Sequence, residues 1–155
     1  MSNNAAAVAS RWARATEQRL KQTFIQAAQT VATNVSVGGK HSPGTPVDTG
    51  FARTKWAATF GDPPTETVPK PKGLKENELL AAGDAAASAM NLTIASADIT
   101  TVVTVHNNTN YLQYLEEGIV TPTKKQFHKG WIAETVHAWP TIVLQASRIV
   151  RKAFG

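Results

Sequence analysis

A short stretch of the sequence, around His41 and Asp48, contains residue types that could do nucleophilic chemistry. These two side chains are an acid and a histidine close together in one loop, and Ser42, Thr45 and Thr49 supply hydroxyl groups. A catalytic triad needs a base placed beside an activated nucleophile, and the sequence contains no triad motif such as the GxSxG nucleophile elbow. The pattern therefore favours a structural loop over an active site.

The stretch "TPVDTGFARTKW" instead reads as a rigid corner. Pro46 fixes its backbone φ angle, and Asp48 can accept hydrogen bonds from amides two residues further on. Gly50 supplies a backbone position that tolerates positive φ. We expect this corner to aim Arg53 and Trp56 outward from a defined point.

The sequence also disfavours metal and cofactor chemistry. The four histidines, at positions 41, 106, 128 and 137, have no HxxxH or HExxH spacing, and there is no cysteine. The VGGKHS segment lacks the glycine spacing and the strand–loop–helix context of a phosphate-binding loop. We therefore expect neither an enzyme nor a bound cofactor or metal.

Positive charge exceeds negative charge in this chain, with a formal net charge of +5. Such a surplus favours polyanionic partners through phosphate attraction, which carries no base readout. A solvated surface and an acidic partner protein are the alternatives for the same lysines and arginines. The cations cluster at Lys70, Lys72 and Lys75, at Lys124, Lys125 and Lys129, and at Arg148, Arg151 and Lys152.

Two adjacent acids, Glu116 and Glu117, are not placed for joint acid–base chemistry. In a helix, neighbouring residues point about 100° apart. We expect them on a solvated acidic surface or in an ion pair with Arg53, either within the chain or across a subunit boundary. Tyr111 and Tyr114 form the apolar side of the same short helix.

The N-terminal half of the sequence predicts a helix, a loop, a strand and a second helix. Apolar residues from Val8 to Val31 recur at helical spacing, which predicts a helix over 5–34. Alternation predicts a short strand over 55–60. Four prolines make 61–74 an extended, flexible connector, and alanine-rich 75–90 suits a weaker helix.

The C-terminal half predicts a strand over 98–106, a short helix that Gly118 closes, a basic loop over 119–130 and a helix over 131–154. Pro140 should kink this last helix or separate two helices. The sequence thus predicts a single α+β domain over 1–155, with long terminal helices packed on a small, mainly antiparallel sheet. Because two strands are few, either 91–97 adds a third, or the helices cover the sheet, or a neighbouring chain completes it.

Two blocks of the sequence resemble a known family. "TPVDTGFARTKW" is similar to the PVDTGRxRxxW block of phage minor tail and tail-completion proteins, and "VTVHNNTNYLQYLEEG" resembles their NNxPYxxxLExG block. The order and spacing of the blocks, followed by a C-terminal helix, also match the family that includes the minor tail protein Z of lambdoid phages. Asn110 and Glu117 depart from the proline and tyrosine of the family pattern, and the 119–130 loop also differs.

The resemblance implies a structural subunit of the virion neck, without catalytic residues. The subunit would form a ring, a hexamer in the virion, that matures the head-proximal end of the tail and joins it to the portal complex. A monomer in isolation is compatible with this. Its partners would be copies of itself, the tail tube or terminator protein, the head connector or portal proteins, and passing double-stranded DNA, with no membrane.

The resemblance also places the protein in the virion, and in the host cytoplasm during assembly. A tail terminator or connector adaptor ring and a stand-alone basic nucleic-acid-binding protein are the alternatives. Residues expected at assembly contacts are Pro46, Asp48, Gly50, Arg53, Trp56, Tyr111, Tyr114, Glu116, Glu117 and Gly118. Lysines expected to face DNA in the lumen are Lys70, Lys72, Lys75, Lys124, Lys125 and Lys129.

Overall fold

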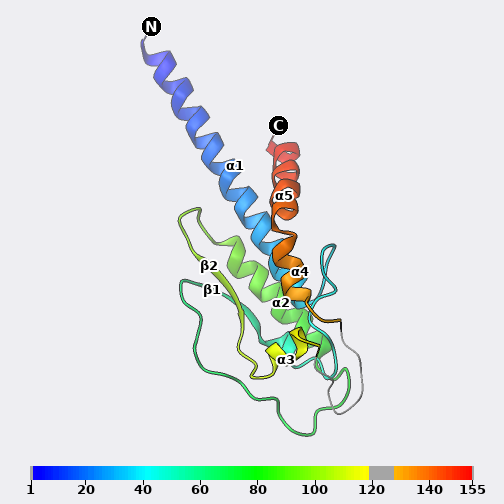
Figure 1. The fold of residues 1–155 in the computed structure, drawn as a ribbon. Helices are drawn as coiled ribbons and strands as arrows, with labels where there is room; N and C mark the ends of the chain where they lie inside the picture. The colour runs from blue at the N-terminus through cyan, green and yellow to red at the C-terminus, as the bar shows by residue number, and fades with distance from the viewer. Residues whose placement is uncertain (1, 119–127, 155) are drawn as a thin grey trace.

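The computed structural model describes residues 2–118 and 128–154, which form an α+β fold (Figure 1). In chain order the elements are α1 (Ser2–Ser36), the 3-10 helix η1 (Ala52–Lys55), β1 (Trp56–Phe60), α2 (Leu80–Ala95), β2 (Val103–Asn107), α3 (Leu112–Glu116), α4 (Trp131–His137) and α5 (Trp139–Phe154). The predicted fold class is confirmed: long terminal helices α1 and α5 pack together, beside a two-stranded antiparallel sheet.

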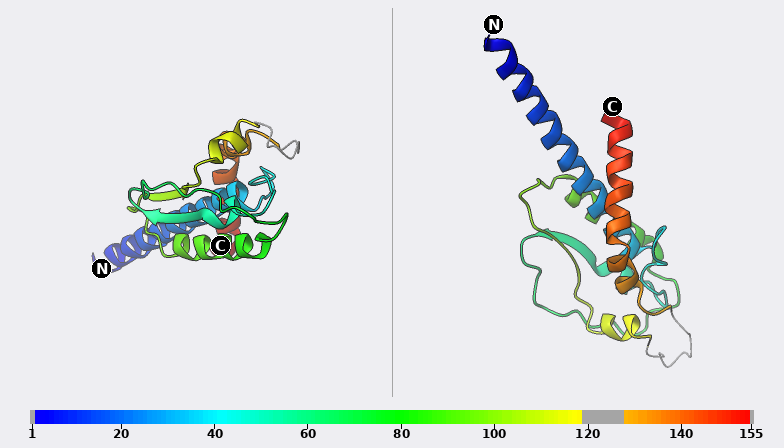
Figure 2. Two further views of the ribbon diagram at one scale, coloured as in Figure 1. Left: turned by 90° about the horizontal axis from the view of Figure 1, so that it is seen from below. Right: turned by 45° about the horizontal axis from the view of Figure 1, so that its top comes forward.

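The C-terminal half of α1 is the centre of the fold, because other elements cover it on two sides. One side packs against the sheet and α2, and another packs against α5 (Figure 2). Small side chains on α1 allow this close approach, since the distance between packed helices depends on the residues at the contact. The first cluster buries Ala28, Ala32, Val35, Trp56, Met90 and Ile94. The second buries Ala27, Ile142 and Ala146.

The sheet pairs β1 with β2 in the register Trp56↔Asn107 to Phe60↔Val103. The predicted alternation holds for its inner face, where Trp56 and Ala58 lie with the β2 valines against the helices. Beside the end of β2, Val68 of the connector makes a single parallel bridge with Thr109. Within the described residues, the sheet has no third strand.

The predicted bounds of α2 and the predicted start of β2 are wrong. Residues 91–95 continue α2, so the strand considered for 91–97 is not formed, and the segment 75–79 precedes the helix. The backbone of this segment is held by the corner, with the Asn77 and Leu79 amides donating to the Asp48 and Thr49 carbonyls. Strand β2 begins later than expected because residues 98–101 form a turn, closed by the Thr101 amide donating to the Asp98 carbonyl.

The predicted break near Pro140 is present as two helices that meet at Ala138. Proline lacks an amide hydrogen and is tolerated in the first turn of a helix, which is where Pro140 lies in α5. Both chain ends lie at the same end of the molecule, where α1 and α5 splay apart (Figures 1 and 2).

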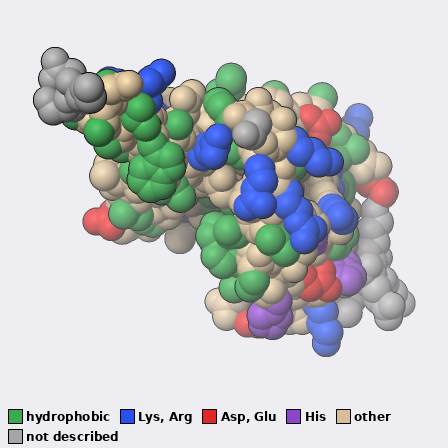
Figure 3. All heavy atoms as spheres, turned by 90° about the horizontal axis from the view of Figure 1, so that it is seen from above, with side chains coloured by type: hydrophobic (Ala, Val, Ile, Leu, Met, Phe, Trp, Pro, Cys, Tyr) green, Lys and Arg blue, Asp and Glu red, His purple; other side chains and the backbone are tan. Residues whose placement is uncertain are grey.

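The N-terminal half of α1 projects beyond the rest of the fold and carries exposed apolar residues (Figures 1 and 3). The sequence predicts one continuous apolar stripe along this helix, but the buried residues begin at Ile25. Trp12 is 71% exposed and Val8 is 52% exposed. We call residues 4–20 the arm.

Among the described residues, no helix is long and apolar enough to cross a membrane.

Candidate functional site

The two blocks that carry the family resemblance meet in one corner at the C-terminal end of α1. Thr45 is the centre of this corner and is fully buried. Its hydroxyl donates to the Val35 carbonyl at 2.8 Å and accepts the Trp56 indole N–H at 2.6 Å. Its backbone amide donates to the Ser36 carbonyl at 3.0 Å. Thr45 therefore satisfies carbonyls that the end of a helix leaves without intrahelical partners.

Gly50 is required by this corner for two reasons. Its φ is +86°, in the left-handed region that disfavours side chains. A Cβ at this position would also lie 2.8 Å from the backbone carbon of Leu79. The expected turn role of Gly50 is thus confirmed, and the turn lies tightly against the chain that leads into α2.

Arg53 and Trp56 point inward, which corrects the expectation that the corner aims them outward. Trp56 is buried in the main core. Arg53 is half-buried and its Nε donates to the Thr45 carbonyl at 3.1 Å. Burial lowers the pKa of the Arg53 guanidinium, and the charge of Asp84 opposes that effect. Gly83 of α2 leaves room for Arg53, because a Cβ there would lie 2.7 Å from the arginine Cβ.

Tyr111 from the second block packs into the same corner, against Ala52, Leu115 and Trp131. Burial raises the pKa of the Tyr111 phenol to about 12, with a further rise from the charge of Asp48. A hydrogen bond to the Ala52 backbone acts in the opposite direction. The tyrosine therefore serves the corner as a neutral packing residue. Tyr114, expected on the same apolar side, is exposed.

Replacing the exposed Tyr114 with phenylalanine leaves Tyr111 as the single phenol of the chain. We expect this phenol to titrate near pH 12 in an ultraviolet absorbance titration. The native state keeps the proton while the unfolded state loses it near pH 10, so folding stability falls as the pH rises from about 10 to 12. Tyr111→Phe should reduce that fall, and a midpoint near 10 in the folded Tyr114→Phe variant would contradict the burial.

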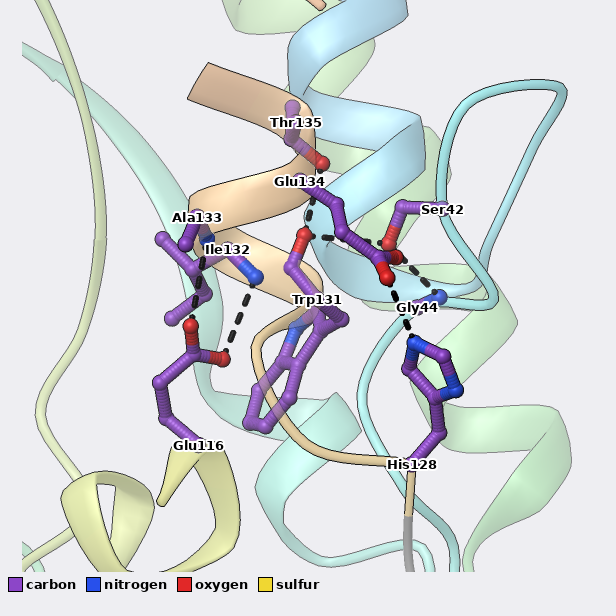
Figure 4. A network of polar contacts seen from close by, with 9 residues as sticks. All are labelled: Ser42, Gly44, Glu116, His128, Trp131, Ile132, Ala133, Glu134 and Thr135. Carbon is purple, nitrogen blue, oxygen red and sulfur yellow. Dashed lines mark hydrogen bonds and ion pairs between the residues drawn. The ribbon is translucent and has the colours of Figure 1, made fainter. Parts of the chain in front are cut away.

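Glu116 binds the start of α4, which corrects the intra-chain ion pair expected between it and Arg53. Its two carboxylate oxygens accept the amides of Ile132 and Ala133, each at 3.1 Å (Figure 4). These amides belong to the first turn of α4, where backbone donors lack partners and negative charge is favourable. The carboxylate thus fastens the second block to the C-terminal helices.

Glu116→Gln should lower the free energy of unfolding by about 1–2 kcal/mol, because glutamine offers one acceptor oxygen and no charge. Urea denaturation measures the change. The adjacent Glu117→Gln is the matched control, since Glu117 is exposed and its side chain accepts from Gln113 on the same helix. Equal losses in both variants would show that the contact with α4 does not stabilise the fold.

Trp131 completes the corner from the side of α4. It is fully buried, and its indole N–H donates to the Val35 carbonyl at 2.9 Å, beside the hydroxyl of Thr45. Its own carbonyl accepts the hydroxyls of Ser42 and Thr135 (Figure 4). The loop at Ser42, α4 and the end of α1 are therefore held at one point.

The corner brings together most of the residues that the sequence predicts at assembly contacts, but it engages them inside the chain. The Asn107 side chain links the blocks by donating to the Ala52 carbonyl at 2.7 Å. Tyr114 and Glu117 are the exposed members of the predicted set. The buried or half-buried members are Pro46, Asp48, Gly50, Arg53, Trp56, Tyr111, Glu116 and Gly118.

The predicted lumen lysines have different surroundings. Lys124 and Lys125 lie outside the described residues. Lys70, Lys72, Lys75 and Lys129 are exposed, and Lys70 pairs with Asp48 at 2.8 Å. Sequence reasoning found the cationic group on the last turns of α5 but missed Arg19, whose guanidinium lies 3.5 Å from the Phe154 carbonyl. Figure 3 shows lysine and arginine side chains gathered on the face seen from above.

The residues first considered for nucleophilic chemistry are held apart by other partners. His41 contacts the Gln145 side chain at 3.2 Å, Asp48 holds Lys70, and the Thr45 hydroxyl is bonded to Val35 and Trp56. Within residues 2–118 and 128–154, no group of three or more histidine or acidic side chains could hold a metal ion. The corner is thus built to position backbone elements.

Comparison of the chain with protein-family models, curated proteins and solved structures finds no match.

Proposed function

We propose that this protein is a structural subunit of a phage virion neck, a tail-completion or head–tail joining protein that forms a ring. The observation that carries the proposal is the meeting of the two family-like blocks in one corner. Arg53 and Trp56 of the first block both donate to Thr45, while Tyr111 and Glu116 of the second block fasten the same corner to α4. Thr45 directly precedes the family pattern, and the other four residues, which the pattern shares, thus have one common structural task.

The shape of the molecule supports an assembly role. The arm projects from a rigid centre with exposed apolar residues, which are costly on a free monomer and are useful at a subunit contact. The sheet has two strands, so backbone groups on its outer edges are available to a neighbour. Exposed Lys72, Lys75 and the cations of α5 would suit weak contact with DNA that must slide past.

The proposal is tested by deleting the gene from the phage genome that encodes the chain. We expect heads and tails to accumulate unjoined, and imaging of complete particles to show the protein as a ring in the neck. Normal joining of heads and tails without the protein would overturn the proposal. A ring found instead at the end of the tail tube, or on the portal, would favour the tail terminator or the connector adaptor.

A stand-alone nucleic-acid-binding protein predicts a different result. Its affinity for double-stranded DNA would be high at low salt and would fall steeply as salt rises, with a slope set by the number of phosphate contacts. The neck subunit should bind weakly as a single chain, because DNA must be able to slide past it and each copy then makes few phosphate contacts. Electrophoretic mobility shifts over a range of salt concentrations distinguish the two.

A further inference from the structure

An apolar groove lies between the C-terminal end of α1, the sheet, α3 and the junction of α4 and α5. Its cavity measures about 500 Å³, which is within the range of sites that bind small ligands. Trp139 and Val136 form its exposed rim, and Val136 is 65% exposed. The lining residues are Val31, Val35, Trp56, Val105, Leu112, Ile132, Thr135, Val136 and Trp139.

The described part of the same chain also carries an apolar surface that none of its other elements covers. On the arm, Ala5, Val8, Ala9 and Trp12 form one exposed patch. A monomeric protein gains nothing from exposing a tryptophan and a valine one helical turn apart. Groove and patch are therefore complementary in their chemistry.

The arm cannot reach the groove of its own chain. Helix α1 is continuous from Ser2 to Ser36, and its residues Val31 and Val35 form one wall of the groove. Trp12 lies 19 residues before Val31, or about 28 Å along the helix axis at 1.5 Å per residue. Only the groove of another molecule is accessible to the arm.

We propose that the arm of one copy docks in the groove of the next, so that Trp12 and Val8 fill it. The inference rests on the proposed function only because it takes a second copy of the chain as the molecule that occupies the groove. Charge also favours this pairing, since Arg11 and Arg14 flank the patch with no acid before Glu17. Two exposed acids lie near the groove: Glu117 directly follows α3, and Glu134 lies on α4. Their negative charge complements the positive charge of the arm.

The contact between one arm and one groove is small, so a stable assembly requires that the copies close into a ring. An arm of 17 residues is about 25 Å long and 10 Å wide, so seating one side of it covers roughly 400 Å² on each partner. That is below the roughly 800 Å² per partner of a stable standard interface. Because arm and groove are different surfaces, the contact is heterologous and each copy makes it twice in a closed ring. A single contact is weak, and the ring is stabilised by all of them together.

Disulfide trapping tests the contact, and the chain suits it because it has no cysteine of its own. The double variant Ala9→Cys/Val136→Cys keeps Trp12 and places one thiol on the arm and one on the groove rim. Oxidation of the purified chain at about millimolar concentration, where contacts with a Kd near 1 mM form, should yield a ladder of covalent dimers, trimers and higher species. The matched control, Ala9→Cys/Leu92→Cys, moves the second thiol to a 74% exposed position on α2 and should yield no ladder.

Three further variants test whether the ladder of cross-linked species arises from the arm–groove contact. A mixture of the Ala9→Cys and Val136→Cys single variants should stop at the dimer, because each copy then has one thiol. Adding Trp12→Ala to the double variant should slow the ladder at least tenfold without unfolding the chain, because Trp12 is exposed. Dimers of Ala9→Cys alone at the same rate would show that arms pair with arms and would overturn the inference.

The inference and the proposed function fail separately. The arm–groove contact is overturned if the Ala9→Cys/Val136→Cys variant forms no more cross-linked species than the Leu92→Cys control. It is also overturned if Trp12→Ala does not slow their formation, even if the protein is found as a ring in the neck. Products of the double variant that end at the dimer overturn the head-to-tail arrangement. A clear ladder from a protein that virions do not contain would leave the contact established and the proposed function wrong.

Discussion

Replacing Gly50 with alanine is expected to lower the free energy of unfolding by about 3 kcal/mol or more. Alanine at its φ of +86° costs about 1–2 kcal/mol by itself. The added Cβ would also lie 2.8 Å from the Leu79 carbonyl carbon, which belongs to backbone and cannot move aside alone. The chain leading into α2 would have to shift, together with its hydrogen bonds to Asp48 and Thr49. Urea denaturation measures the loss.

Gly61→Ala separates the two causes. Its φ of +85° matches that of Gly50, but no atom lies within 4 Å of an added Cβ. We expect this control to lose about 1–2 kcal/mol, the backbone cost alone. Equal losses at both positions would mean that the close approach between the corner and α2 relaxes without cost.

Trp131→Ala is expected to lower the free energy of unfolding by about 3–5 kcal/mol, the range for removing a large buried aromatic side chain. The substitution empties a fully buried site and removes the indole donor of the Val35 carbonyl. Trp12→Ala is the control, because that tryptophan is 71% exposed; at micromolar concentration it should change stability by less than about 0.5 kcal/mol. Similar losses for both would contradict the different burial of the two residues.

The sequence predicts the elements well where local signals agree. The alternation around Trp56 predicts β1 to within one residue, since Lys55 belongs to η1, and Pro140 predicts the junction of α4 and α5. The signals fail for two different reasons. Asp98 and Thr101 lie in the predicted strand, but hydrogen bonds between them close a local turn. The start of α2 is delayed by distant residues, because Asn77 and Leu79 bond to the corner.

The sequence predicts where the corner lies but not which residues form hydrogen bonds within it. Turn chemistry marks the corner around Pro46 and Gly50, but no periodicity reports that Thr45, Trp131 and Val35 meet, since up to 96 residues separate them. The Arg53–Glu116 pair considered within the chain is not formed, because each side chain finds backbone partners instead; a pair across a subunit boundary stays a prediction. Tryptophans are equally ambiguous in sequence: Trp56 and Trp131 are buried, whereas Trp12 is exposed.

Helix α1 is packed along its C-terminal half between the sheet, α2 and α5, whereas its N-terminal half has no buried residue among those described and projects from the fold. A rod held in this way acts as a lever. Between Ile25 and Val8 it measures about 26 Å, so a bend of roughly 10° at the packed end would displace its tip by about 5 Å. The buried alanines of α1 determine the angle at which the helix packs. A small change in that angle therefore moves the arm further than a change in any contact near its tip.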